Sequence, residues 1–131
     1  MALELLLHEY AAHVHINDVS RPVFAFWTCV LNRTDELLAR IVSMPTTVSF
    51  WKRQRAVLRD QDNADDLQLG FATFYLNRTN RSGILNGGVI GGLSQLGEWK
   101  LDARLNRQDL AKRIELIARQ RARISLTRLD A

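Results

Sequence analysis

The stretch from Phe71 to Gly92 changes character so sharply that it limits what this chain can fold into. It begins as an apolar, helix-like segment that ends near Leu76. Five polar side chains follow within six positions, and then four glycines, at positions 87, 88, 91 and 92. Because glycines at this density destabilise helices and strands, we predict a buried helix that ends in a polar loop or hairpin.

The polar part of this stretch is rich in side chains that recognise bases. It contains Asn77, Arg78, Asn80, Arg81 and Ser82. Arginine pairs bidentately with the edge of guanine, and asparagine pairs in the same way with adenine. The loop is therefore predicted to face nucleic acid. A polar surface loop with helix-capping asparagines explains the same composition and stands as the alternative.

Composition restricts the class of protein. The 131 residues are enough for one domain, and a hydrophobic content of 47% is enough for a core. The single cysteine, Cys29, excludes a disulfide within the chain and indicates a cytoplasmic location. No apolar run approaches the length of a membrane span, and the N-terminal residues lack the features of a secretory signal, so no membrane partner is predicted.

The net charge of +4 is concentrated in the last part of the chain. Residues 97–131 hold nine basic and five acidic side chains, whereas residues 1–96 hold nine of each. A basic patch of this kind would attract phosphates. An exposed arginine-rich helix accounts for the same excess, so the charge leaves both interpretations open.

Hydrophobic periodicity predicts alternating helices and strands. Helices are expected over residues 2–10, 21–31, 35–44, 47–59, 67–77 and 107–121, and strands over 12–19 and 124–128. Residues 83–105 are expected to be irregular, with Trp99 as their hydrophobic anchor and Asn106 as the cap of the following helix. Thr34 is predicted to cap the helix that starts at residue 35. The order suggests part of an α/β sheet with helical insertions, because two parallel strands alone would leave an apolar face and edge uncovered.

Asp18 is predicted to lie at the C-terminal end of a strand, directly before a helix. In nucleotide-binding α/β folds an acidic residue at this place accepts hydrogen bonds from ribose hydroxyls. A turn residue that only leads into the helix has the same sequence context. Both interpretations of Asp18 therefore stay open on the sequence.

The remaining candidates have simpler interpretations. His13 and His15 share a strand face near His8, but no carboxylate or cysteine completes a set, so half-exposed histidines and no metal are predicted. The glycines at 87–92 lack the Lys and Ser/Thr of a P-loop and are predicted to form a turn. Cys29 has no nearby histidine or second cysteine and is predicted to be a buried structural thiol.

Several separated motifs resemble those of Dam-type DNA adenine methyltransferases, and more specifically their phage and prophage branch. Phe74-Tyr75-Leu76-Asn77-Arg78-Thr79, followed by Ser82-Gly83-Ile84, is similar to the signature of that family. The resemblance extends to His15-Ile16-Asn17-Asp18, to the aromatic segment at residues 23–27 and to residues 99–106. It covers nearly the whole chain in the order that the family has.

The resemblance implies an incomplete Rossmann-like α/β domain, mostly helical, with a DNA-recognition helix and hairpin inserted. The family transfers a methyl group from S-adenosylmethionine to the N6 amine of adenine in double-stranded DNA, after flipping the base out. By position, Asp18 would bind the ribose of the cofactor. The DNA-binding residues carried over are Asn77, Arg78, Arg81, Ser82, Gly83 and Asn86. Relatives commonly carry an aromatic residue at position 81 and Asn at 82, so the recognised DNA sequence is not carried over.

The resemblance also implies that the chain is an internal part of a methyltransferase. The cofactor-binding glycine loop of the family would precede residue 1, and its Asp-Pro-Pro-Tyr motif would follow residue 131. We therefore expect one partial domain, with residues 1–31 and 107–131 on the sheet side and 34–105 as the helical DNA-recognition region. No catalytic residue is assigned, and the missing parts of the enzyme would be partners. A non-catalytic DNA-binding module or a decayed prophage product is the alternative.

Overall fold

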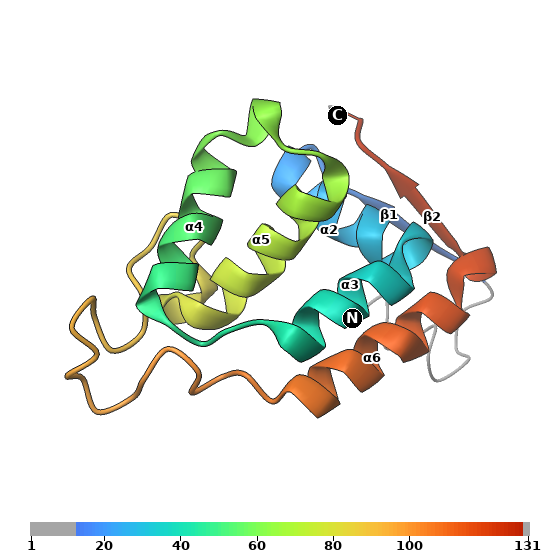
Figure 1. The fold of residues 1–131 in the computed structure, drawn as a ribbon. Coiled ribbons are helices and arrows are strands. Elements are labelled where there is room, and N and C mark those ends of the chain that lie inside the picture. The colour runs from blue at the N-terminus through green and yellow to red at the C-terminus, as the bar shows by residue number, and fades with distance from the viewer. Residues whose placement is uncertain (1–12, 130–131) are drawn as a thin grey trace.

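The computed structural model describes residues 13–129. The helix predicted over residues 2–10, which includes His8, lies outside that range. The described chain is mostly helical and contains a small parallel sheet (Figure 1). Its elements are β1 (Val14–Asn17), α2 (Arg21–Asn32), α3 (Thr34–Ser43), α4 (Val48–Arg59), η1 (Gln61–Asn63), α5 (Asp66–Thr79), η2 (Arg81–Gly83), α6 (Arg107–Arg119), η3 (Arg121–Arg123) and β2 (Ile124–Thr127). The predicted order is confirmed for these residues, and each boundary lies within about two residues of its prediction.

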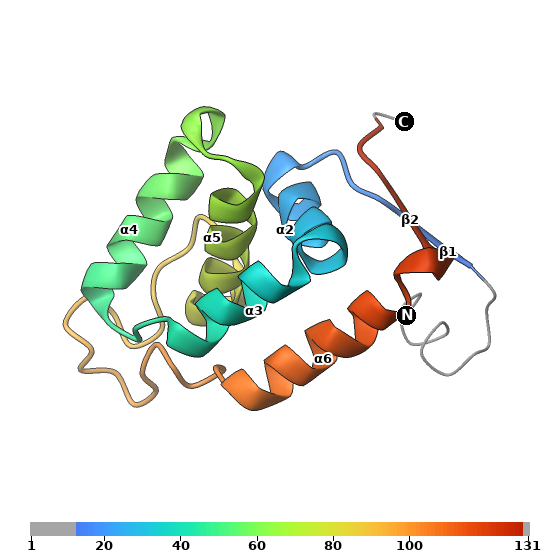
Figure 2. The ribbon, with the colours of Figure 1, turned by 45° about the vertical axis from the view of Figure 1, so that its right-hand side comes forward.

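Helix α5 is the centre of the molecule. In both views α4 and α2 lie on opposite sides of it (Figures 1 and 2), and α3 also contacts it. The prediction of a buried helix here is confirmed, since Leu67, Phe71, Phe74 and Tyr75 are buried. Gln68 is exposed, but every position from 69 to 76 is buried. A helix that is surrounded by others needs apolar or small side chains all round rather than one stripe.

Gly70 allows α2 and α5 to approach closely. A Cβ atom at this position would lie 2.7 Å from the sulfur of Cys29 and 2.8 Å from the carbonyl oxygen of Ala25. The Cys29 thiol is fully buried and donates to the carbonyl oxygen of Asp66 at 3.1 Å. Burial, with the Asp66 carboxylate second, raises the pKa of this thiol to about 11. Cys29 is therefore the buried structural thiol that was predicted.

One of the two predicted N-cap residues caps its helix and the other does not. Asn106 caps α6 as predicted, because its side chain accepts from the backbone N–H of Asp109 at 3.1 Å. The prediction that Thr34 caps α3 is wrong. Arg33 occupies the N-cap position, and the Thr34 hydroxyl instead donates to the carbonyl oxygen of Val30 at 2.7 Å. Only one residue separates α2 from α3, so the hydroxyl reaches back into the preceding helix.

The two strands pair in parallel, with Val14 opposite Ile124 and Ile16 opposite Leu126. These four side chains face the helices and join the core. The opposite face is polar, which corrects the expectation of an uncovered apolar face. There the His13 ring pairs with the Ser125 hydroxyl at 2.6 Å, and the His15 ring pairs with the Thr127 hydroxyl at 2.8 Å. Strict alternation of apolar and polar residues in both strands produces this two-sided sheet.

The sheet side and the helical region form a continuous packed unit. Helix α2 contacts both β2 and α5, and α3 packs along α6. The hydrophobic core accordingly extends from Val14 in β1 through α5 to Leu101 in the long loop. Across residues 13–129, none of the helices combines the length and the apolar character that crossing a bilayer requires.

Candidate nucleic-acid interface

Asn80 anchors the chain where α5 ends. Its side chain has no exposed surface, although it lies in the middle of the most polar run of the sequence. Its amide oxygen accepts from the indole N–H of Trp51 at 2.7 Å. Its amide nitrogen donates to the carbonyl oxygens of Ile84 and Leu85, at 2.8 and 3.0 Å. A single buried side chain thus ties α4 to the loop after α5.

The loop between Asn80 and Val89 reverses the direction of the chain. These two residues form an isolated antiparallel bridge. The backbone N–H of Arg81 donates to the carbonyl oxygen of Gly88, and that of Ile90 donates to Thr79, both at 2.9 Å. We call residues 81–88, which this bridge encloses, the closed loop.

The closed loop begins with a tight turn. Ser82 and Gly83 have φ values of +55° and +68°, so both lie in the left-handed region. Two consecutive residues with positive φ are typical of the turn that connects hairpin strands. A Cβ atom on Gly83 would lie 3.0 Å from the side-chain nitrogen of Asn77, so glycine also makes room for α5. The turn displays the side chains of residues 81 and 82.

Three of the six predicted DNA-binding residues are exposed on the closed loop: Arg81, Ser82 and Asn86. Within the described chain, the guanidinium of Arg81 has no hydrogen bond or ion pair. The backbone of Arg81 is fixed by the bridge, whereas its guanidinium has no partner among the described residues. That combination leaves all its donors available to an external acceptor.

The other three predicted residues build the scaffold of the loop. Asn77 donates to the carbonyl oxygen of Gly83 at 3.3 Å, and Gly83 forms the turn. Arg78 donates through two nitrogens to the carbonyl oxygen of Arg104, at 3.2 and 2.8 Å. Arg104 in turn donates to the carbonyl oxygen of Asn77 at 3.2 Å. These residues therefore connect the end of α5 to the segment before α6.

The same connection concentrates positive charge beside the closed loop. Partial burial lowers the pKa of Arg78, and the nearby guanidiniums of Arg104 and Arg113 lower it further. The Asp109 carboxylate acts in the opposite sense and is the smallest of these influences. A guanidinium that is destabilised by its cationic neighbours gains from a nearby anion. The electrostatics at this end of α5 therefore favour a negatively charged ligand.

Residues 91–105 form a second, longer loop in which Gln95 is the central residue. Its amide nitrogen donates to the carbonyl oxygens of Ile90 and Gly92, and its amide oxygen accepts from the backbone N–H of Leu101 at 3.0 Å. The prediction that Trp99 anchors this region is wrong, because its side chain is 68% exposed. Leu101 and Val89 are buried instead and connect the loops to the core.

Asp18 lies directly after β1 and before α2, as predicted. One of its carboxylate oxygens accepts from the backbone N–H of Ser20 at 2.8 Å. Ser20 occupies the N-cap position of α2, but its own side chain makes no capping hydrogen bond. Asp18 therefore shapes the start of α2, and its second carboxylate oxygen has no donor among the described residues.

Metal ligands do not gather in the part of the chain that the structure describes, where no group of three or more His, Cys, Asp or Glu side chains surrounds a common point. His13 and His15 do share one face of β1, as predicted. Each is paired with a hydroxyl of β2, which orients both rings along the sheet.

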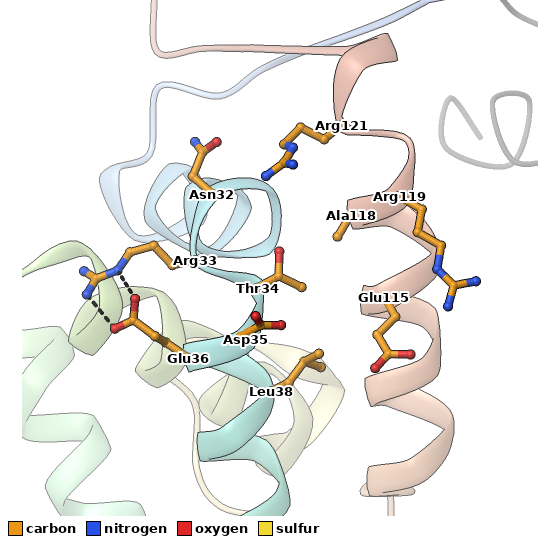
Figure 3. Close-up of a pocket in the computed structure, with 10 residues that line it drawn as sticks. All are labelled: Asn32, Arg33, Thr34, Asp35, Glu36, Leu38, Glu115, Ala118, Arg119 and Arg121. Atoms are coloured by element: carbon orange, nitrogen blue, oxygen red, sulfur yellow. Dashed lines mark hydrogen bonds and ion pairs between the residues drawn. The ribbon is translucent and has the colours of Figure 1, made fainter.

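A large surface hollow lies between the α2–α3 junction and α6, with a volume of about 490 Å³ (Figure 3). Its lining carries three arginines and three carboxylates, so the charges balance. Arg33 and Glu36 point toward one another there and form an ion pair at 2.8 Å. A balanced lining has no preference for phosphate, and this hollow does not belong to the candidate interface.

Sequence reasoning missed the two residues that position the interface. Asn80 was grouped with the exposed polar residues around it, although its amide is the buried anchor. Arg104 lies in a segment without periodicity and joins Arg78 only through the tertiary fold. A sequence signal for the buried Asn80 was Trp51, because a buried indole N–H needs a hydrogen-bond acceptor.

Comparison of the chain with protein-family models, with curated proteins and with solved structures gives no match.

Proposed function

We propose that this protein binds double-stranded DNA and that it is the recognition part of an S-adenosylmethionine-dependent DNA adenine methyltransferase. One observation carries the proposal. The buried Asn80 amide fixes a closed loop on which Arg81 and Ser82 are exposed, and the Arg81 guanidinium has no partner among the described residues. The anchor holds the loop in one shape, so the places of the two exposed side chains are fixed.

A fixed backbone with a free guanidinium is suited to reading a base edge. Arginine donates two parallel hydrogen bonds to O6 and N7 of guanine in the major groove. Holding the loop in its bound shape reduces the entropy that is lost on binding. The arginines beside the loop, Arg78 and Arg104, would meet the adjoining phosphates, which fix the position of a protein on DNA without selecting a sequence.

The cofactor assignment rests on Asp18. Its free carboxylate oxygen is suited to accept from a ribose hydroxyl at the C-terminal end of a parallel strand. S-adenosylmethionine supplies the methyl group in reactions of this class. The chain contains no Asp-Pro-Pro-Tyr sequence, so no residue of this chain is assigned to the methyl-transfer step.

DNA binding is tested first, because it carries the proposal. Sites are selected from a library of random duplexes, and affinity for the selected site is measured by fluorescence anisotropy at several salt concentrations. Arg81→Ala is expected to weaken binding to the selected site by about 1–3 kcal/mol and to spare non-specific binding. Arg119→Ala, an exposed arginine on α6, serves as the control. If wild-type protein binds no duplex at low salt, the proposal is wrong.

Methyl transfer separates the two forms of the proposal. We expect binding without incorporation of labelled methyl groups into unmethylated DNA by this chain alone. Binding of S-adenosylmethionine that Asp18→Asn weakens would support the methyltransferase assignment. DNA binding without any cofactor binding would instead favour a non-catalytic DNA-binding module. Robust methyl transfer by the chain would contradict the absence of catalytic residues.

A further inference from the structure

A hollow of about 480 Å³ lies at the edge where both parallel strands end. In Figures 1 and 2 the end of β2, the beginning of α2 and the end of α4 lie along the same side of the molecule. The closed loop completes the wall through Leu85 and Asn86. The polar residues that line the hollow are Ser20, Arg21, Arg59, Gln61, Asn86 and Arg128. Ligands of α/β sheets commonly bind at this edge.

The three arginines of the hollow come from α2, from α4 and from the residue after β2, and two are fixed by hydrogen bonds. Arg21 donates to the carbonyl oxygens of Gln61 and Ala64, the latter at 2.9 Å. Arg128 donates through Nε to the carbonyl oxygen of Val19 at 3.0 Å, which leaves its terminal nitrogens available. Arg59 is exposed and has no hydrogen bond within the described chain. The guanidiniums therefore gather without a shared internal acceptor.

None of the described residues that line this hollow carries a carboxylate. Within residues 13–129 the two ion pairs join Arg33 to Glu36 and Arg113 to Asp109, so none of the three arginines is neutralised by a salt bridge. Two of the described acidic residues that lie close along the chain have other hydrogen-bond partners. Asp18 accepts from the backbone of Ser20, and Asp60 accepts from the amide of Asn63 at 2.7 Å. Asp62 in η1 is exposed.

Helix α2 adds to the same field. Its first residues line the hollow, and its N-terminal end carries a partial positive charge from the aligned peptide dipoles. The Ser20 side chain makes no capping hydrogen bond, so the start of the helix keeps unpaired donors. Three arginines from separate parts of the chain and a helix start thus line a space that is larger than a single phosphate group.

We propose that this hollow binds a phosphate group. Two sources share that chemistry: a backbone phosphate of the DNA that the closed loop contacts, or the phosphate of a free nucleotide. The first source rests on the proposed function, because Leu85 and Asn86 belong both to the closed loop and to the wall of the hollow. The second source is independent of it.

The test compares Arg59→Gln, Arg128→Gln and the double variant with Arg119→Gln as the control. The Arg59 side chain is exposed and has no hydrogen bond in the described structure, so its variant is expected to keep the fold. Binding of inorganic pyrophosphate is measured by calorimetry, with sodium chloride holding the ionic strength constant. Each single substitution is expected to weaken pyrophosphate binding about tenfold, as the loss of a charge-assisted hydrogen bond does. The double variant should show no measurable binding.

Duplex DNA distinguishes the two sources. If the hollow takes a backbone phosphate, Arg59→Gln lowers the slope of log affinity against log salt by about 1. An unchanged slope with weakened pyrophosphate binding assigns the site to a free nucleotide. Pyrophosphate binding in a protein that binds no DNA leaves this inference standing while the proposed function fails. Equal pyrophosphate affinity in all variants, or none in the wild type, overturns it.

Discussion

Helix α5 and the two loops that follow it are held in place by different physical means. The helix is buried on all sides, and its position results from packing against α2, α3 and α4. The loops over residues 81–105 contain several exposed apolar side chains. Directional hydrogen bonds from Asn80 and Gln95 hold the backbone of these loops in place. Burial of apolar surface is non-directional and tolerates small adjustments, whereas a hydrogen bond requires particular atoms at particular distances.

This difference separates stability from shape. Substitutions in α5 are expected to lower the free energy of unfolding of the whole protein. Substitutions in the loops are expected to change the surface that meets DNA, with effects on stability that depend on whether a buried polar group loses its partner. The following predictions test that separation, beginning with the largest expected effect.

Replacing an aromatic side chain is expected to affect the free energy of unfolding very differently in the two regions. Phe71→Ala in α5 removes a side chain that is 2% exposed and is expected to cost about 3–5 kcal/mol of unfolding free energy. Trp99→Ala in the loop removes one that is 68% exposed and should change stability by less than about 0.5 kcal/mol. Urea denaturation followed by circular dichroism measures both. A comparable loss in the two variants would show that the loop is part of the core.

Asn80→Ala removes the link between the two regions. It leaves the buried indole N–H of Trp51 and two carbonyl oxygens without their partner, and we expect a loss of about 3 kcal/mol. The same variant should weaken DNA binding at temperatures where it is still folded. Trp51→Phe removes the donor together with part of a buried ring, so its cost combines a lost hydrogen bond with a cavity. A stable variant with unchanged DNA affinity would contradict the role of Asn80 as an anchor.

Alkaline pH tests the tight crossing of α2 and α5. The pKa of the Cys29 thiol is about 11 in the folded protein, against an ordinary value of 9.0. The thiol therefore holds its proton more tightly in the folded protein than in the unfolded chain. Its contribution to the free energy of unfolding is fully present below about pH 9, and about 2–3 kcal/mol is lost as the pH rises to about 11. Burial raises the pKa of Tyr75 to about 12, which extends the decline.

The Cys29→Ala variant isolates the contribution of the thiol. Its urea midpoint should be nearly independent of pH between 9 and 10, where the wild type already becomes less stable. The decline in the variant should begin near the ordinary tyrosine pKa of about 10. Identical pH profiles for the two proteins would mean that the thiol is not protected by burial.

Two glycine substitutions in the closed loop have the smallest expected effects. Gly83→Ala forces an L residue to a φ of +68°, where its Cβ meets Asn77, and should cost about 1–2 kcal/mol. Gly88→Ala is the matched control, because no atom outside its chain neighbours lies within 4 Å of its added Cβ. Thermal melts compare the two variants, and DNA affinity shows whether the turn at Ser82 has moved. Equal effects would argue against a strained turn at position 83.

Local sequence signals predicted the regular elements well. Periodicity located α2, α4, α5 and α6, and alternation located both strands, because side-chain spacing follows directly from backbone geometry. Asn106 was recognised as a cap because the capping hydrogen bond spans only three residues. Thr34 was misassigned because its hydroxyl has a competing acceptor in the preceding helix, which only the close succession of α2 and α3 supplies.

The candidate interface depends more strongly on the tertiary structure. Its position after a buried helix and its polar composition were visible in the sequence. The sequence did not show which of these polar residues are structural. Asn77 and Arg78 hold the loop in place, whereas the Arg81 guanidinium has no partner among the described residues. Trp99 was expected inside on hydrophobicity alone. Leu101 is buried in its place, because hydrogen bonds from Gln95 determine which residues of the loop turn inward.

By itself, the sequence determined the order of helices and strands, the burial of α5 and the abrupt change to a polar, glycine-rich loop. These properties follow from spacing and conformational preference, which act over a few residues. Only the tertiary structure decided that Asn80 is buried, that Arg78 and Arg104 meet, and that Arg21, Arg59 and Arg128 line a common hollow. Those arrangements join residues from distant parts of the chain, and the packing around α5 brings them together.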